Sequence, residues 1–247
     1  HHLADNMMAI AKQVCPPQMT LEFSVEPQAA LGTGGGIAYA KAILSDADPV
    51  LIVNGDVLAS LDITTALEHH TACDASATLL LTEADHACEF FGVGIDARTY
   101  VTGFWGEPHP REVQRLAFTG VHILSRALRN QLPTNREACV KMDGWIPAIA
   151  RGEAIIGANV EGTWFDLGTP KRYLFAHRLV SEELSRWTDW PERRSGVYSA
   201  DPIPPNVEVI GPVTLGPNLQ AAGHATIGPH CHIGAHVSLE ANVRLSN

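Results

Sequence analysis

The chain has 247 residues, 45% of them hydrophobic and 18% charged, which is enough for one large α/β domain or for a domain with a smaller appendage. Its formal net charge of −10 argues against a nucleic-acid or anionic-membrane partner, because such partners require clustered Lys and Arg. Five scattered cysteines without a C-x-x-C pair predict neither a disulfide framework nor a zinc site, and no apolar run approaches the roughly 20 residues that span a bilayer.

Helices and strands alternate along the first part of the chain. Apolar residues at helical spacing near the start predict a helix that is already under way at the first residue, so we expect the chain to lack an N-terminal segment. The pattern then predicts a strand at 21–25, a glycine-rich turn at 32–36 and a helix at 37–44.

The short apolar run Val50–Val53 is typical of a strand that is covered on both faces, which implies a parallel sheet. The alternation continues with expected helices and strands at 63–71 (helix), 75–82, 91–95 and 118–124 (strands), 125–131 (helix), 154–160 and 164–166 (strands), and from Pro170 to about Leu184 (helix). We therefore predict an α/β domain over 1–184, followed by a linker without clear periodicity over 185–206.

The last segment, 207–247, carries an internal repeat with a period of six residues. Two columns of mostly apolar residues keep this period: Val207, Val213, Leu219, Ala225, Cys231, Val237 and Val243 form one, and Val209, Leu215, Ala221, Ile227, Ile233, Leu239 and Leu245 form the other. Hexapeptide periodicity is the signature of a parallel β-helix, in which each unit makes one flat side and inward residues stack. Because the pattern still runs at Asn247, we predict an incomplete left-handed β-helix whose open end favours a homo-oligomer.

Three short stretches could carry chemistry. Small residues at Gly32–Gly36 precede a helix, where free N–H groups favour an anion or a carbonyl, although this motif by itself favours a structural turn. Asp56 follows the apolar strand at the sheet end where α/β proteins bind ligands, and its carboxylate suits Mg²⁺, but Asp is also a common turn residue or cap. Asp166 closes a later strand and has the same two interpretations, so the two carboxylates could share one Mg²⁺.

Five stretches, taken together in order and spacing, resemble the sugar nucleotidyltransferases, and among them the mannose-1-phosphate guanylyltransferase-like and N-acetylmuramate-1-phosphate uridylyltransferase-like branch. The stretches are Leu31–Gly36, Val53–Leu58, Phe91–Val93, Phe118–Leu124 and Trp164–Pro170. The resemblance covers about Leu3 to Val180 and implies a Rossmann-like, mostly parallel sheet over 1–184. A hexapeptide tail is a common addition in this branch.

The resemblance also implies a reaction and a set of roles. An oxygen of a sugar 1-phosphate would attack the α-phosphorus of a nucleoside triphosphate and release pyrophosphate. Asp56 and Asp166 would be catalytic and would hold Mg²⁺. The remaining roles would be nucleotide binding by Glu26, Gly32, Thr33 and Gly34, and sugar binding by Gly92, Glu107 and Gly120.

Two departures from the family pattern bear on activity. The family's glycine-rich signature loop, with its Arg and Lys, is missing together with the first strand, so we expect the chain as given to be weak or inert. Many relatives carry Glu-Lys-Pro where this chain reads Gly-Glu-Pro, which puts Glu107 where a lysine would meet the sugar phosphate. Lys141, Arg111, Arg115 or another cation would have to supply that positive charge.

Three functions stay open at this point. The first is an active nucleotidyltransferase, and the second is a non-catalytic paralogue that binds a nucleotide sugar and regulates, which Glu107 favours. The third is acyl transfer in the hexapeptide tail, with a histidine from the set His224, His230, His232 and His236, although exposed corner histidines are the commoner explanation. The motifs do not identify the base or the sugar, and the scattered cysteines fit a cytoplasmic location.

Overall fold

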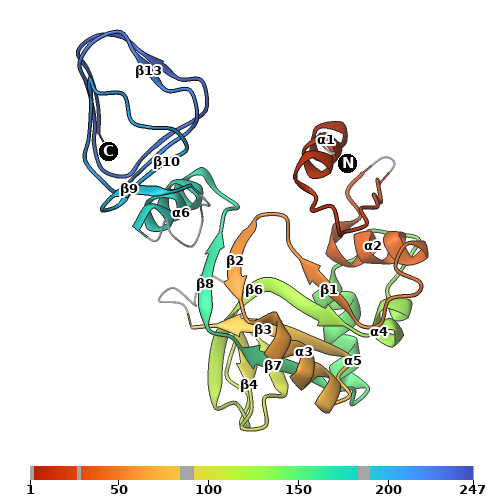
Figure 1. Cartoon of the computed structure of the whole chain (residues 1–247). Helices are drawn as coiled ribbons and strands as arrows, with labels where there is room; N and C mark the ends of the chain where they lie inside the picture. The colour runs from red at the N-terminus through yellow and green to blue at the C-terminus, as the bar shows by residue number, and fades with distance from the viewer. Residues whose placement is uncertain (1–2, 27–28, 84–91, 183–189, 247) are drawn as a thin grey trace. The chain divides into compact units, whose positions relative to one another are not determined.

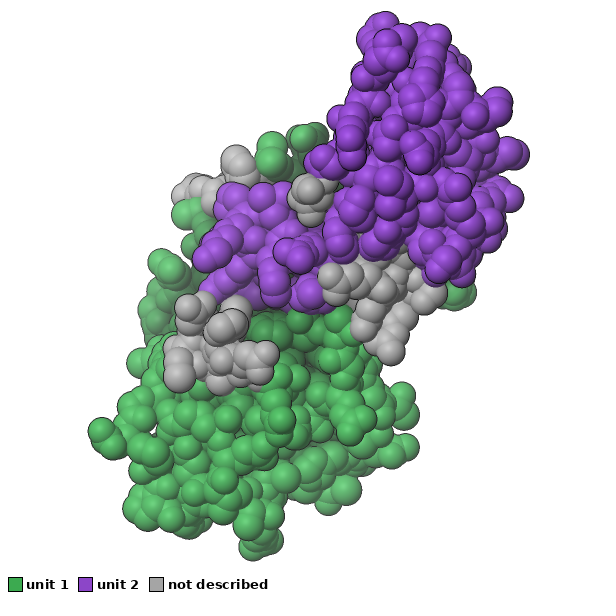
Figure 2. All heavy atoms as spheres, turned by 90° about the vertical axis from the view of Figure 1, so that its left-hand side faces the viewer, with its two compact units in different colours: residues 1–164 green, residues 165–247 purple. Residues whose placement is uncertain are grey.

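The computed structural model describes residues 3–26, 29–83, 92–182 and 190–246 (Figure 1). The chain divides into two compact units, residues 1–164 and 165–247 (Figure 2). Two predicted boundaries, the strand start at Phe91 and the helix end at Leu184, lie outside the described residues, and so does the last residue, Asn247. Within the described part of the chain, no helix combines the length and the apolar character needed to cross a membrane.

A mixed β-sheet forms the centre of the first unit. Its strands are β1 (Val50–Val53), β3 (Ala77–Thr82), β4 (Gly92–Ile95), β5 (Val101–Phe104), β6 (Gln114–Leu124) and β7 (Ile155–Asn159). Strand β6 lies in the middle of the order β5-β4-β6-β3-β7, and β1 also pairs with it. Strands β1, β3 and β4 run antiparallel to β6, whereas β7 is parallel to β3. The predicted α/β sheet is confirmed, and β1, β3, β4 and β7 share one direction within it.

The first unit also contains several helical segments. They are α1 (Ala4–Val14), α2 (Gly32–Tyr39), the 3-10 turn η1 (Ala40–Ala42), α3 (Ile63–Ala72), α4 (Arg126–Gln131), the π-helix η2 (Val140–Trp145) and α5 (Ile146–Ala150). Side-chain caps fix two of the helix starts, since Asp62 accepts a hydrogen bond from the backbone N–H of Thr65 in α3, and Ser125 accepts one from that of Leu128 in α4. A separate two-stranded sheet joins β2 (Val57–Leu61) to β8 (Gly162–Asp166).

Strand β3 is covered on both faces. Leu79, Leu80 and Leu81 are each 0% exposed. Leu79 and Leu81 pack in the cluster that includes residues of α2, α4, η2 and α5, whereas Leu80 packs in the cluster that includes Ala66 of α3. Because successive side chains of a strand point to opposite faces, the sheet has a buried layer on each side.

Two sequence predictions for this unit are wrong. In β1, Leu51 is 41% and Val53 is 53% exposed, so this strand is not covered on both faces. Residues 21–25 form no strand, although their side chains alternate. Alternation of apolar and polar residues fits a strand with one buried face, but a strand also requires a neighbouring strand to which its backbone can hydrogen-bond. Among the described residues, this segment has no such neighbour.

The second unit consists of helix α6 (Pro170–Glu182) and a set of short strands. They are β9 (Glu192–Arg194), β10 (Val197–Ser199), β11 (Val207–Val209), β12 (Val213–Leu215), β13 (Gln220–Ala221), β14 (Ala225–Ile227), β15 (Cys231–Ile233), β16 (Ser238–Leu239) and β17 (Val243–Leu245). Among strands β11 to β17, the described pairings are parallel with an offset of 18 residues, as in Val207 with Ala225 and Ala225 with Val243. Three six-residue sides per turn give this offset, which supports the predicted β-helix.

Part of the segment that was expected to be a linker is ordered into strands. Strand β10 pairs in parallel with β12, and β9 pairs antiparallel with β10. The guanidinium of Arg194 donates a hydrogen bond to the carbonyl of Val209, which attaches this segment to the β-helix strands. Strands of three residues are too short to show a period, which explains why the sequence pattern missed them.

Candidate active site

The glycine-rich segment begins a helix instead of forming a turn before one, which corrects the sequence prediction. Helix α2 starts at Gly32, whose φ is +72°. The N–H groups of Gly34 and Gly35 donate to the carbonyl oxygen of Ala138, at 2.8 and 3.2 Å, and the N–H of Ala138 donates to Leu31. These two helical N–H groups are therefore not free for an anion, as the sequence had suggested. A Cβ on Gly32 would stand 2.5 Å from the Ala138 oxygen, so glycine permits this approach.

The residues predicted to bind the nucleotide collect at this helix end. The hydroxyl oxygen of Thr33 accepts a hydrogen bond from the N–H of Val140 at 3.1 Å. A carboxylate oxygen of Glu26 accepts one from the N–H of Leu31 at 3.0 Å, and a Cβ on Gly36 would lie 2.9 Å from the other oxygen. The structure thus places Glu26 beside the glycine-rich helix start, but its hydrogen bond there is a structural one to the backbone of Leu31.

The π-helix η2 links this helix end to the turn that carries Glu107. The ammonium nitrogen of Lys141, in η2, lies 3.5 Å from the centroid of the Trp105 ring. The backbone N–H of Trp105 donates to the carbonyl of Gly92 at 3.0 Å. Trp105 and Gly106 both have positive φ, 53° and 76°, so the chain turns sharply just before the exposed Glu107. Gly92 and Glu107, both predicted to bind the sugar, therefore belong to one local structure.

Aromatic packing connects η2 to the central strand β6. Trp145, the last residue of η2, stacks on Phe104 with ring centroids 5.8 Å apart. The edges of Phe118 and His122 meet the same indole at 5.3 and 5.2 Å. This cluster fixes η2 against the sheet, because such ring pairs contribute beyond the area that they bury.

Asp56 and Gly120 lie on adjoining segments. The N–H of Asn54 donates to the carbonyl of Gly120 at 2.9 Å, which holds the turn that carries the exposed Asp56 against β6. Gly120 has a φ of +79°, and a Cβ there would stand 2.8 Å from the side chain of Val57. Position 120 therefore requires glycine, because its backbone lies close to Asn54 and Val57, the residues on either side of the turn that carries Asp56.

Asp166 belongs to the second unit, unlike the other predicted site residues. One of its carboxylate oxygens accepts a hydrogen bond from the N–H of Gly168 at 2.8 Å, and the other accepts one from the guanidinium of Arg172 at 3.3 Å. These contacts are those of a turn residue at the start of α6. Among the residues that the structure describes, no three His, Cys, Asp or Glu side chains are grouped to bind a metal ion. The shared Mg²⁺ site of Asp56 and Asp166 stays a prediction.

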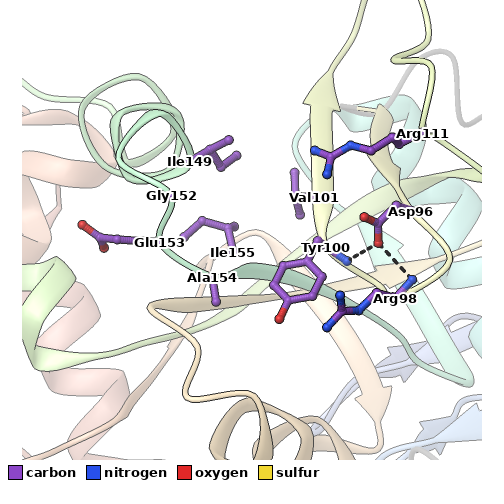
Figure 3. A pocket seen from close by; sticks show the side chains of 10 residues that line it. All are labelled: Asp96, Arg98, Tyr100, Val101, Arg111, Ile149, Gly152, Glu153, Ala154 and Ile155. Carbon is purple, nitrogen blue, oxygen red and sulfur yellow. Dashed lines mark hydrogen bonds between the residues drawn. The ribbon is translucent and has the colours of Figure 1, made fainter.

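A pocket of about 560 Å³ opens elsewhere in the first unit (Figure 3). It is lined by Asp96, Arg98, Tyr100, Val101, Arg111, Ile149, Gly152, Glu153, Ala154 and Ile155. Of these, only Arg111 was named from the sequence, as one of the cations that could meet the sugar phosphate. The Asp96 carboxylate accepts hydrogen bonds from the N–H groups of Arg98 and Tyr100, at 2.9 and 3.0 Å, which accounts for its place in the turn after β4.

Sequence reasoning named Lys141 only as one of three cations and did not single out Trp105. A π-helix has no sequence signature, and the two residues are far apart in the chain. The acid at position 107 was the only signal that pointed to a compensating cation nearby.

Comparisons with known proteins find relatives by sequence and by fold. A family model described as "Nucleotidyl transferase" matches residues 3–183. The mannose-1-phosphate guanylyltransferase of Mycobacterium tuberculosis is 29% identical over 145 residues, which are 58% of this chain and 40% of that protein. The mannose-1-phosphate guanyltransferase of Schizosaccharomyces pombe is 27% identical over 175 residues, or 68% of this chain and 46% of its own length. The chain thus spans about half the length, or less, of these relatives.

Solved structures show the same fold. HddC from Yersinia pseudotuberculosis superposes with a TM-score of 0.58 at 22% identity, over 70% of this chain and 72% of that one. A second structure of HddC, with a TM-score of 0.57, is a complex with GMP-PN. The UDP-glucose pyrophosphorylase of Acinetobacter baumanii gives a TM-score of 0.56 at 19% identity, over 72% of this chain and 66% of that one.

Proposed function

Because the chain belongs to the nucleotidyl transferase family, we propose that the protein joins a nucleoside triphosphate to a sugar 1-phosphate, with release of pyrophosphate. The observation that carries this proposal is the set of contacts around η2. The N–H of Val140 reaches Thr33 of the glycine-rich helix, and the next residue, Lys141, lies over Trp105 beside Gly92. Within the first unit, these contacts connect Thr33, predicted to bind the nucleotide, through η2 and Trp105 to Gly92, predicted to bind the sugar.

Catalysis of this reaction requires mainly that the two substrates be positioned and that the charge developing on the phosphates be stabilised. An oxygen of the sugar 1-phosphate attacks the α-phosphorus, a new P–O bond forms, and the bond to the β-phosphate breaks as pyrophosphate leaves. Gly32, Thr33 and Gly34 would meet the base. Gly92 and Gly120 would admit the sugar, because glycine lets a ligand approach the backbone closely.

Asp56 and Asp166 would hold Mg²⁺. Asp56 is exposed at the end of β1, and hard carboxylate oxygens are the ligands that Mg²⁺ prefers, with substrate phosphates completing the shell. Asp166 fits this role only if its carboxylate gives up its hydrogen bonds with Gly168 and Arg172 and binds the ion in their place. When bound, the ion would neutralise the charge that develops on the phosphates.

The proposal is tested by pyrophosphate release from the protein, with Mg²⁺ and pairs of nucleoside triphosphates and sugar 1-phosphates. We expect one pair to react, and we expect Asp56→Asn to lower turnover at least 100-fold by the loss of a charged ligand. Asp46→Asn removes an exposed carboxylate a few residues after η1 and is the matched control. Normal turnover by Asp56→Asn would refute the metal assignment.

A non-catalytic, nucleotide-sugar-binding paralogue is the second candidate, and Glu107 favours it. This candidate predicts binding of a nucleotide sugar without pyrophosphate release from any pair of substrates. We further propose a cytoplasmic location, which the free thiols of the four described cysteines support, and a homo-oligomer formed through the β-helix.

A further inference from the structure

The pocket of Figure 3 lies at the turn between β4 and β5. This turn supplies Asp96, Arg98 and Tyr100, and the segment from Ile149 to Ile155, between α5 and β7, supplies the opposite wall. The volume of about 560 Å³ is within the range of about 300–1,000 Å³ that small-molecule sites occupy. The pocket can therefore hold a small ligand.

This pocket is separate from the residues predicted to bind the sugar. Because β4 and β5 pair antiparallel, the turn lies at one end of their hairpin, and the start of β4 and the end of β5 lie at the other. Gly92 stands at that other end, where its carbonyl oxygen accepts a hydrogen bond from the N–H of Trp105 at 3.0 Å. A strand rises about 3.4 Å per residue, so Gly92 and Ile95 are roughly 10 Å apart along β4. A ligand as small as a simple phosphate ester therefore occupies only one of the two places.

Two arginine side chains reach the pocket from different segments. Arg98 belongs to the hairpin turn, and Arg111 belongs to the loop between β5 and β6. Figure 3 shows both guanidinium groups extending toward the wall formed by α5 and β7. The guanidinium carbon of Arg98 lies 5.6 Å from the centroid of the Tyr100 ring. Within the part of the chain that the structure describes, neither arginine forms an ion pair with a carboxylate.

The two acids of the pocket wall are bonded to other groups. One carboxylate oxygen of Asp96 accepts hydrogen bonds from two backbone N–H groups of its own turn, at 2.9 and 3.0 Å. The carboxylate of Glu153 accepts hydrogen bonds from the guanidinium of Arg151 at 2.7 Å and from the hydroxyl of Ser76 at 2.8 Å. Figure 3 shows the Glu153 carboxylate pointing away from the two arginines of the pocket. The charge of these two arginines is therefore left for a ligand.

We propose that this pocket binds a small phosphate ester, with its phosphate held between Arg98 and Arg111. The planar N–H donors of a guanidinium match the oxygens of a phosphate, and two guanidinium groups balance the charge of a dianion. The ring of Tyr100 and the side chains of Val101 and Ile155 give the organic part of the ligand an apolar wall. This site does not depend on the proposed transferase activity, because it lies apart from the residues proposed to bind the substrates of that reaction.

The test is isothermal titration calorimetry of the protein, without Mg²⁺ or nucleotide, against phenyl phosphate, glycerol 3-phosphate, glycerol and succinate. We expect the two phosphate esters to bind and glycerol not to bind. Arg98→Gln and Arg111→Gln should each weaken the binding of a phosphate ester by about 10- to 100-fold, the range for a lost charged hydrogen bond. Arg126→Gln, which removes an exposed arginine of α4, is the matched control and should bind like the wild type.

Three results would overturn the inference. One is that neither phosphate ester binds to the wild type. Another is binding that only one of the two arginine substitutions weakens, or neither, because the phosphate would then not lie between the two side chains. The third is tighter binding of succinate than of either ester, which would assign the pocket to dicarboxylates. Both arginines are exposed, so their substitution should leave the unfolding midpoint unchanged, and this measurement will show that the variants are folded.

Discussion

Acidification should destabilise the fold through His122, whose imidazole is buried in the first unit. The residue is 2% exposed, and neither ring nitrogen has a hydrogen-bond partner among the described residues. Burial lowers the pKa of His122 to about 3, whereas an unfolded chain restores the ordinary value of 6.5. Below pH 6.5 the unfolded state therefore binds a proton that the folded state does not, and the free energy of unfolding falls as the pH falls.

The size of this effect follows from the two pKa values. One pH unit corresponds to about 1.4 kcal/mol, so near pH 4.5 the fold should have lost about 2.7 kcal/mol relative to pH 8 from this residue alone. His122→Leu replaces the ring by an apolar side chain of similar volume and removes the titrating group. The free energy lost between pH 8 and pH 4.5 should be smaller in this variant by about 2.7 kcal/mol.

Urea unfolding at the two pH values, followed by tryptophan fluorescence, measures this difference. Trp145 lies 5.2 Å from the His122 ring, so its emission reports on the same part of the core. His224→Gln, which removes an exposed histidine, is the control and should unfold with the pH dependence of the wild type. If His122→Leu and the wild type lose the same free energy on acidification, the buried imidazole is not the cause.

Three further predictions concern local structure and are checked by urea unfolding midpoints at pH 8. Gly32→Ala should destabilise the fold by at least about 1–2 kcal/mol because of its positive φ, whereas Gly55→Ala, where a Cβ meets nothing within 4 Å, should change little. Ser125→Ala removes the N-cap of α4 and should cost about 1 kcal/mol. Trp164→Phe loses the 2.6 Å hydrogen bond to the carbonyl of Thr119 and should cost about 0.5–1.5 kcal/mol. Unchanged midpoints would contradict each assignment.

Elements whose signal is local could be predicted from the sequence. Helix α3 was expected at 63–71 and occupies Ile63–Ala72, and α6 begins at Pro170 as expected. The six-residue period was also visible, because it repeats many times and each unit supports the next. In these segments, propensity, capping residues and hydrophobic period agree.

Elements whose state depends on a distant neighbour could not be predicted in the same way. Three adjacent glycines have low helix propensity, yet Gly34–Gly36 lie within α2. The carbonyl of Ala138 approaches them closely and accepts hydrogen bonds from two of their N–H groups. Residues 21–25 have the right alternation for a strand but no paired neighbour in the described structure. A short stretch of sequence shows neither which distant backbone will contact it nor whether a neighbouring strand will pair with it.

The residues of the candidate site also differ in whether the sequence alone could identify them. Asp56 could be found because it directly follows an apolar strand, and Gly120 because a recognisable motif contains it. The contact of Lys141 with Trp105 could not be predicted, because the two residues are far apart in the chain and come together only through the placement of η2. Motifs locate the residues that a family shares, whereas contacts between distant segments are visible only in the folded chain.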